Sequence, residues 1–139
     1  MELVLEKSAD IKEVSQGFSD VVDWRKYDGQ RVKGSSGPNI YLMLNGILRI
    51  IPNPQTYVQL FRNWDGISVN DYLVDNAPSG EPLTNGSVLI NDGGRIYLVT
   101  LSHKMWVPDM PTYNRFNFGM AIAVPPIVAQ YIPTGPNVG

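Results

Sequence analysis

An apolar hairpin pattern that occurs twice constrains the fold of this chain more than any other feature. In the first copy two apolar runs, Ile40–Leu44 and Ile47–Ile51, flank Asn45-Gly46, and Pro52 follows the second run. Asn-Gly between apolar runs is the strongest short-range indication of a two-residue turn with positive φ at both central residues. Proline ends a strand because it has no N–H for the ladder. The stretch 40–57 therefore predicts a hairpin, a proline corner and the start of a short helix.

The same order of residues returns later in the chain. The matching segments are Ile40–Leu42 with Ile96–Leu98, Pro52 with Pro108, Thr56-Tyr57 with Thr112-Tyr113, and Pro78–Gly80 with Pro133–Gly135. The predicted offset is 57 residues from Arg31–Lys33 to Val88–Ile90, 56 at the hairpin, and 55 from Ile67–Val69 to Ile122–Val124. Insertions and deletions that fall only in loops are typical of a duplication, because loops tolerate them.

We predict an α+β fold in which two tandem repeats of about 55 residues form one domain with pseudo-twofold symmetry. Residues 1–27 form an N-terminal strap, residues 28–83 the first repeat and residues 84–139 the second. Each repeat is expected to contain the hairpin, the proline corner, a short helix, a strand and a second short helix. A unit of this length buries little apolar surface alone, so a shared core is the physical reason to duplicate. The almost continuously apolar hairpins favour strands that are covered on both faces.

The strap carries two weaker patterns. Leu3–Leu5 is expected to form an edge strand. Asp10 and Glu13 have the spacing of a capping box, so a short helix that ends near Gly17 is predicted after them. We expect the strap to pack on the pair of repeats.

Composition excludes several classes of function. The net charge is −2 and the basic residues are scattered, so the sequence lacks the electrostatic footprint of a nucleic-acid or anionic-membrane binder. The absence of cysteine excludes disulfides and thiolate chemistry. No apolar run is long enough to span a bilayer, and the first residues lack the features of a signal peptide, which favours a chain made without one.

Catalytic constellations are not evident in the sequence. His103 is the single histidine and is expected to be a surface residue beside the second hairpin turn. Asp71 and Asp75 lie one helical turn apart with Asp65 nearby, which would suit acid–base chemistry or calcium, but a solvated helix face is favoured. The glycine-bearing loops match no phosphate-binding motif and are expected to be turns. The sequence thus predicts no enzyme, no metal and no cofactor.

The candidate ligand site is the polar turn around Trp64. We expect Arg62, Asn63, Trp64, Asp65 and Asp71 to form it, because an exposed indole among amides and carboxylates is a common way to bind a sugar ring. The alternative is a Trp64 that folds back to cover the core. The matching stretch of the second repeat, Gly119-Met120-Ala121, keeps no aromatic residue, so the first repeat is expected to carry the better site.

The first repeat also resembles a known sequence pattern. The stretch YLMLNGILRIIPNPQTYVQLFRNWDGI, followed by Pro-Ser-Gly-Glu-Pro-Leu, resembles a tandem repeat of bacterial secreted, cell-surface and toxin-associated proteins. The resemblance extends from Asp28 to about Val138. It implies action outside the cell or at its surface and assigns no catalytic residue. The second copy departs from the pattern, with Leu101-Ser102 in place of Asn-Gly and Met110 in place of a proline.

These observations lead to three hypotheses about function. The first is a non-catalytic, lectin-like recognition module for glycans or another cell-surface ligand, in which self-association as a homo-oligomer would supply avidity. The second is an accessory or structural component of a toxin or secreted assembly that acts through protein contacts, which exposed apolar side chains in Val124–Ile132 would favour. The third, an enzyme, would require a deep pocket that collects carboxylates from both copies.

Overall fold

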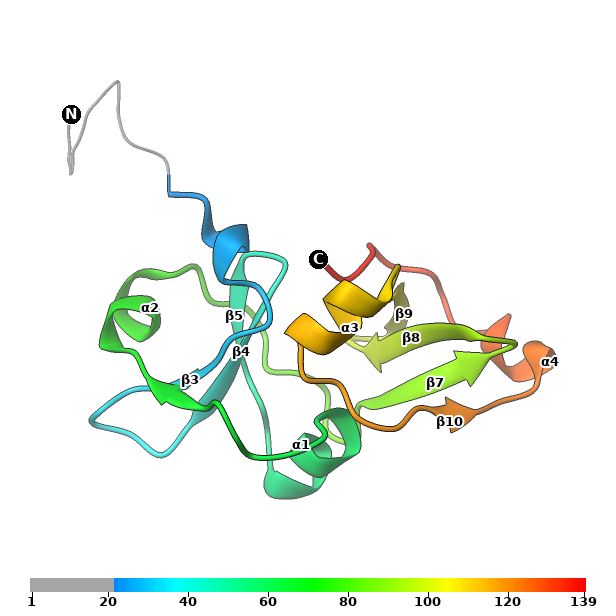
Figure 1. The fold of residues 1–139 in the computed structure, drawn as a ribbon, viewed down its shortest axis with the longest axis horizontal. Coiled ribbons are helices and arrows are strands. Elements are labelled where there is room, and N and C mark those ends of the chain that lie inside the picture. Colours follow the sequence, from blue (N-terminus) through cyan, green and yellow to red (C-terminus); the bar gives the residue numbers. More distant parts are fainter. Residues whose placement is uncertain (1–21) are drawn as a thin grey trace.

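Two four-stranded sheets with the same topology make up the described part of the protein (Figure 1). A computed structural model describes residues 22–139. The first sheet contains β3 (Arg31–Lys33), β4 (Ile40–Leu44), β5 (Ile47–Ile50) and β6 (Ser68–Val69), and the second contains β7 (Val88–Asp92), β8 (Arg95–Thr100), β9 (His103–Trp106) and β10 (Ile122–Ala123). In each sheet a hairpin is antiparallel to the first strand, and the last strand pairs parallel with that first strand.

Short helices follow the strands at equivalent places in the two halves. They are α1 (Pro54–Leu60) and α2 (Asp71–Asn76) in the first repeat, α3 (Met110–Arg115) and α4 (Pro126–Ala129) in the second, and a 3-10 turn, η1 (Trp24–Tyr27), ahead of both. The predicted α+β fold with two similar halves is therefore confirmed. The strand predicted at Leu3–Leu5 and the helix predicted after Asp10 lie outside the described residues.

The ladders correct the predicted alignment of the outer strands. Val32 is paired with Tyr41 and Ile90 with Tyr97, so Val32 corresponds to Ile90, 58 residues later. Ser68 pairs with Val32, and Ile122 pairs with Ile90. Ser68 therefore corresponds to Ile122, 54 residues later. The predicted offsets of 57 and 55 were each wrong by one residue. Strands this short carry too few side chains to fix a register, so pairing with the hairpin fixes it instead.

The predicted turn at Asn45-Gly46 is confirmed. Asn45 has φ 53° and Gly46 has φ 78°, as a turn with two left-handed central residues requires. Leu101 and Ser102 adopt the same conformation in the second repeat, with φ 53° and 66°, without a glycine. The hairpin is thus kept where its preferred turn residues are lost.

The helix after each proline corner begins with a polar cap. The Thr56 N–H donates to Asn53 Oδ1 at 2.8 Å, and the Thr112 N–H donates to Asp109 Oδ1 at 2.8 Å. α1 starts at Pro54, inside the stretch where a helix start is predicted, because proline suits the first helical position. Tyr57 and Leu60 of this helix, and Phe61 directly after it, are buried.

One apolar cluster draws on both repeats. It contains residues from both hairpins and the residues just after them, from α1 and β7, and from the segments that follow α1, α2, α3 and α4: Leu42, Leu44, Ile51, Tyr57, Leu60, Phe61, Leu83, Leu89, Leu98, Met105, Val107, Phe116, Phe118 and Val138. The opposite face of the first sheet packs its own cluster around Met43, and that of the second packs one around Tyr97. Both hairpins are therefore covered on both faces, as the sequence predicted.

The two repeats meet at a short antiparallel contact. The Arg62 N–H donates to the Asn117 carbonyl at 3.0 Å, and Phe61 pairs with Phe118. Arg62 and Phe118 are equivalent positions, as are Phe61 and Asn117. The contact is therefore self-complementary, which a twofold relation between the repeats requires.

The Pro-x-Gly segments cover the hairpin edges of the sheets. Ser79 bridges to Leu48, and Thr134 bridges in the same parallel sense to Lys104. A Cβ atom on Gly135 would lie 2.6 Å from His103 Nδ1, so only glycine lets this segment lie against the ring. Ahead of the first repeat, Trp24 of η1 packs against the cluster around Met43 on the first sheet.

Candidate functional site

Tyr57 and Arg31 fix the loop that follows α1. The Tyr57 hydroxyl donates to the Asn63 carbonyl at 2.8 Å, and the Arg31 guanidinium donates to the Tyr57 oxygen at 2.5 Å and to the Asp65 carbonyl at 2.6 Å. Burial raises the pKa of Tyr57 above its ordinary value, against the opposing effect of Arg31, so the phenol stays a proton donor at neutral pH. In the second repeat the Tyr113 hydroxyl likewise donates to the Gly119 carbonyl.

Trp64 stacks on this anchored phenol. The ring centroids of Tyr57 and Trp64 are 3.8 Å apart and their planes are 9° from parallel. Tyr57 is 1% exposed and Trp64 is 49% exposed. Trp64 therefore covers a buried tyrosine and at the same time presents half of its surface to solvent, which combines the two alternatives that the sequence left open.

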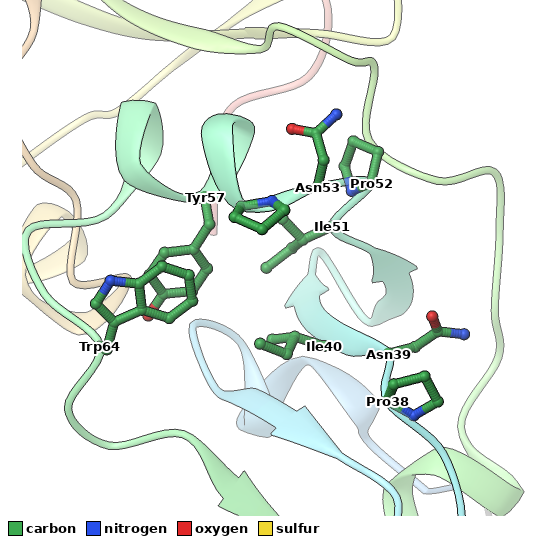
Figure 2. A pocket seen from close by; sticks show the side chains of 9 residues that line it. Pro38, Asn39, Ile40, Ile51, Pro52, Asn53, Tyr57 and Trp64 are labelled. Atoms are coloured by element: carbon green, nitrogen blue, oxygen red, sulfur yellow. The ribbon is translucent and has the colours of Figure 1, made fainter.

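A pocket lies between Trp64 and the base of the first hairpin (Figure 2). Its volume is about 190 Å³. Figure 2 shows Trp64 and Tyr57 on one side, Pro38 and Asn39 on the other, and Ile40 and Ile51 between them. The remaining lining residues are Pro52, Asn53 and Pro54. Since pockets for drug-sized ligands are roughly 300–1,000 Å³, this one has room for a single small ring.

Two amides supply the polar groups of this pocket. Asn53 Oδ1 caps α1, and Asn53 Nδ2 donates to Asn85 Oδ1 at 2.7 Å, so this amide is held rigidly with one N–H remaining. Asn39 is exposed, and within residues 22–139 its side chain has no hydrogen bond. Apolar walls with a small number of polar groups at the rim are typical of small-ligand sites.

The five predicted site residues do not come together. Trp64 lines the pocket, but Arg62 turns toward the second repeat, where its guanidinium donates to the Phe118 carbonyl and to Asn114 Oδ1. Asp71 is the first residue of α2 and does not line the pocket; its carboxylate accepts the Ser35 N–H at 2.8 Å, and hydrogen bonds from Ser35 lower its pKa.

The two neighbours of Trp64 shape the turn. Asn63 Oδ1 accepts the Asp65 N–H at 3.2 Å, and neither residue lines the pocket. Tyr57, Asn39 and Asn53 line the pocket and were not among the predicted site residues. The sequence signal nearest to them is the proline corner, because Ile40 and Pro52 recur as Ile96 and Pro108 beside these positions, with Val107 in place of Ile51.

The described part of the chain lacks two features of metal-dependent and membrane-spanning proteins. Within residues 22–139 no group of three or more His, Asp or Glu side chains could hold a metal ion. No helix there has the length and apolar character needed to cross a bilayer. His103 is half-buried against Gly135, and its Nδ1 has no hydrogen-bond partner there.

Comparison with known proteins adds nothing to this geometry, because no family model, no curated protein and no solved structure matches the chain.

Proposed function

We propose that the protein is a non-catalytic recognition module that binds a sugar ring in the Trp64 pocket. The observation that carries this proposal is the half-exposed indole stacked on a buried, anchored tyrosine at the rim of a small pocket. The resemblance to a repeat of secreted and surface proteins agrees with it. Glycans of a cell surface are the ligand class that this proposal favours.

The physical argument rests on rigidity and on the match of surfaces. A sugar ring has an apolar face of C–H groups that packs on an aromatic face, and hydroxyls that pair with amides. The stacked Tyr57 fixes the indole before any ligand arrives, so little conformational entropy is lost on binding. Asn39 and the rigid Asn53 can then exchange hydrogen bonds with hydroxyl groups. A single shallow pocket gives modest affinity, and self-association would raise it through avidity.

A glycan array probed with the purified protein, followed by titration of any hit, tests the proposal. Trp64→Ala is expected to weaken binding by about tenfold or more, equivalent to about 1.4 kcal/mol. It should lower the free energy of unfolding by only about 0.5–1.5 kcal/mol, the value of a lost aromatic pair. Asn39→Ala should weaken binding with no effect on stability, because the side chain is exposed.

Tyr72→Ala is the matched control, since Tyr72 is also a half-exposed aromatic residue but lies on α2 outside the pocket. It should bind glycans as the unaltered protein does. No array hit, or a hit whose affinity the Trp64 and Asn39 variants leave unchanged, would contradict the proposal.

A second candidate function has an observation of its own. Five large apolar side chains of the second repeat are exposed within the short stretch that contains β10 and α4, which Figure 1 draws in orange: Met120, Ile122, Ile127, Val128 and Tyr131. Large apolar side chains left exposed close together in the sequence favour a surface for protein contacts. The second candidate is therefore a component of an assembly that acts through protein contacts.

Sedimentation velocity over a range of protein concentrations tests whether this surface joins copies of the chain. Self-association that Ile127→Glu abolishes would support the second candidate, and Val69→Glu, on the equivalent strand of the first repeat, is the control. A mass that stays monomeric at every concentration, or association that survives Ile127→Glu, would argue against self-association through this surface.

A further inference from the structure

The second repeat has a pocket at the same place as the Trp64 pocket. Its volume is about 240 Å³, and it lies between the start of β8, the proline corner after β9, and α3. Eight lining positions correspond one to one, each 56 residues after its equivalent: Gly94, Arg95, Ile96, Val107, Pro108, Asp109, Met110 and Tyr113 match Pro38, Asn39, Ile40, Ile51, Pro52, Asn53, Pro54 and Tyr57. The duplication has therefore reproduced the pocket as well as the fold.

Each pocket has a tryptophan, but from a different position. Met120, the equivalent of Trp64, is 88% exposed and does not line the second pocket. Trp106 lines it instead, from the last residue of β9, and is 38% exposed. The expectation that the second repeat lacks an aromatic platform considered only the turn after the helix, and it missed an indole that reaches the pocket from the hairpin.

The second pocket differs from the first in charge. Arg95 stands where the first repeat has Asn39, and its side chain is exposed. Asp109 stands where the first repeat has Asn53, but its carboxylate is occupied in capping α3, and hydrogen bonds from Thr112 lower its pKa. Asp92 is opposite Arg95 in the β7–β8 ladder. Within residues 22–139 no ion pair or hydrogen bond engages the Arg95 guanidinium.

We propose that this second pocket binds a sugar that carries a carboxylate, such as a uronic acid, with Arg95 as the group that selects it. This inference rests on the proposed function and extends it to a second site with a different preference. The arginine fork donates two parallel hydrogen bonds to a carboxylate, and charge-assisted bonds of that kind are about twice as strong as neutral ones. Trp106 would take the C–H face of the ring, as Trp64 does in the first pocket.

The two pockets together define a ligand class. Both lie on repeats that share one core, so they are held at a fixed separation. A polysaccharide with both neutral and uronic residues would occupy both pockets at once only if its spacing and path match that separation. Two linked sites raise the overall affinity well above that of either alone when the ligand spans them.

NMR titration of the full ¹⁵N-labelled chain tests the proposal, because each tryptophan indole N–H gives its own signal. Trp64→Phe and Trp106→Phe assign the two signals. The probes are two matched pairs: cellotriose with the β-1,4-linked glucuronic acid trimer, and the α-1,4-linked galacturonic acid trimer with its methyl ester. Within each pair the carboxylate is the main difference. The Trp106 signal is expected to respond to at least one acidic trimer with a Kd about tenfold or more below that for its neutral partner.

Exchanging the selecting residue makes the test specific. Arg95→Asn should abolish the acid preference reported by Trp106, and Asn39→Arg should create one reported by Trp64. Arg25→Asn, which removes the same charge from η1 outside this pocket, should leave the preference unchanged. Raising the salt concentration should weaken the acidic trimer more than the neutral one.

The outcomes separate this inference from the proposed function. A Trp106 signal that stays unchanged, or that responds equally to acidic and neutral trimers, would overturn the inference even if Trp64 responds. An acid preference that survives Arg95→Asn would overturn the role of Arg95. If the Trp64 indole signal does not shift with any probe or array hit, the proposed function of the first repeat is contradicted. A Trp106 signal that shifts with an acidic trimer would still support the second pocket.

Discussion

Arg31 is a buried arginine at a position where the second repeat has a core leucine, Leu89. The ladders place it opposite Leu42, and Leu89 lies opposite Leu98, so Arg31 takes the position of a core leucine. It is only 7% exposed, and its guanidinium lies over the Phe61 ring and donates to oxygen atoms of Tyr57 and the Trp64 loop. A buried cation is costly unless it is hydrogen-bonded, and here the bonds go to the loop that carries the indole.

Arg31→Leu should therefore cost little stability and loosen the loop. We expect a change in the free energy of unfolding of about 1 kcal/mol or less, because a leucine fits the equivalent position and the Tyr57 hydroxyl keeps the Asn63 carbonyl. Relaxation measurements on the amides of residues 62–66 should show faster motion, and glycan binding at Trp64 should weaken. Leu89→Arg is the matched control and should be severely destabilising. A loss of about 3 kcal/mol or more for Arg31→Leu would contradict this role.

Asp28 is a buried carboxylate whose ionisation lowers the free energy of unfolding. Its Oδ1 accepts the Gly46 N–H at 2.9 Å, and burial raises its pKa above the ordinary value, partly offset by that hydrogen bond and by Arg25. Because the folded pKa lies above the unfolded one, the folded state binds more protons between the two values. Stability therefore falls as the pH rises from the unfolded pKa through the folded pKa.

Asp28→Asn should remove this part of the pH dependence and keep the acceptor for Gly46. Urea denaturation at a series of pH values from acidic to neutral should show a smaller decrease in stability than in the unaltered protein, with no loss at pH 7. Asp28→Ala should cost roughly 1–3 kcal/mol, because the buried Gly46 N–H is left unpaired. An unchanged pH profile for Asp28→Asn would rule out this assignment.

At the scale of elements, the two hairpin turns form a natural comparison. Gly46 and Ser102 occupy the same position with φ 78° and 66°, and only the first is a glycine. A residue with a Cβ atom costs roughly 1–2 kcal/mol in the left-handed region. A Cβ on Gly46 would also lie 3.3 Å from Arg25 Cγ.

Opposite substitutions at this one position should have opposite effects. Gly46→Val should lower the free energy of unfolding by roughly 1–2 kcal/mol or more, and Ser102→Gly should raise it by about 0.5–1 kcal/mol. Thermal denaturation of the two variants beside the unaltered protein measures both. A melting temperature unchanged by Gly46→Val would contradict the turn assignment.

Most elements of the fold were predictable from local chemistry, and the register was not. Asn45-Gly46, Pro52 and the Asn70 cap of α2 each act within a few residues, so the sequence indicates their structure directly. β6 and β10 contain two residues each, and their pairing depends on contacts far along the chain. The offsets predicted for these strands and for the first strand of each repeat therefore differ from the ladders by one residue.

At the scale of the molecule, the repeat predicted the shared core but not the pocket. A duplicated unit too small to bury its own apolar face implies a common core, and the central cluster contains Leu42 and Leu98 from the two hairpins. The candidate site was predicted from neighbours in sequence, and of those residues only Trp64 lines the pocket. Asn39 and Tyr57 reach it from separate elements on either side of the repeated proline corner, and Trp106 reaches the second pocket from the hairpin, so neighbours in sequence do not indicate that these side chains line a pocket.

Because the two repeats share one core, we expect both repeats, and hence both pockets, to unfold as one cooperative unit. Urea unfolding of two variants with two tryptophans replaced by phenylalanine tests it most directly. Trp24→Phe with Trp106→Phe leaves Trp64 to report on the first repeat, and Trp24→Phe with Trp64→Phe leaves Trp106 to report on the second. In each variant, tryptophan fluorescence and far-UV circular dichroism should give one transition with the same midpoint and slope, because the core contains residues of both repeats. A tryptophan signal that changes at a urea concentration where the circular dichroism shows the other repeat still folded would contradict the account.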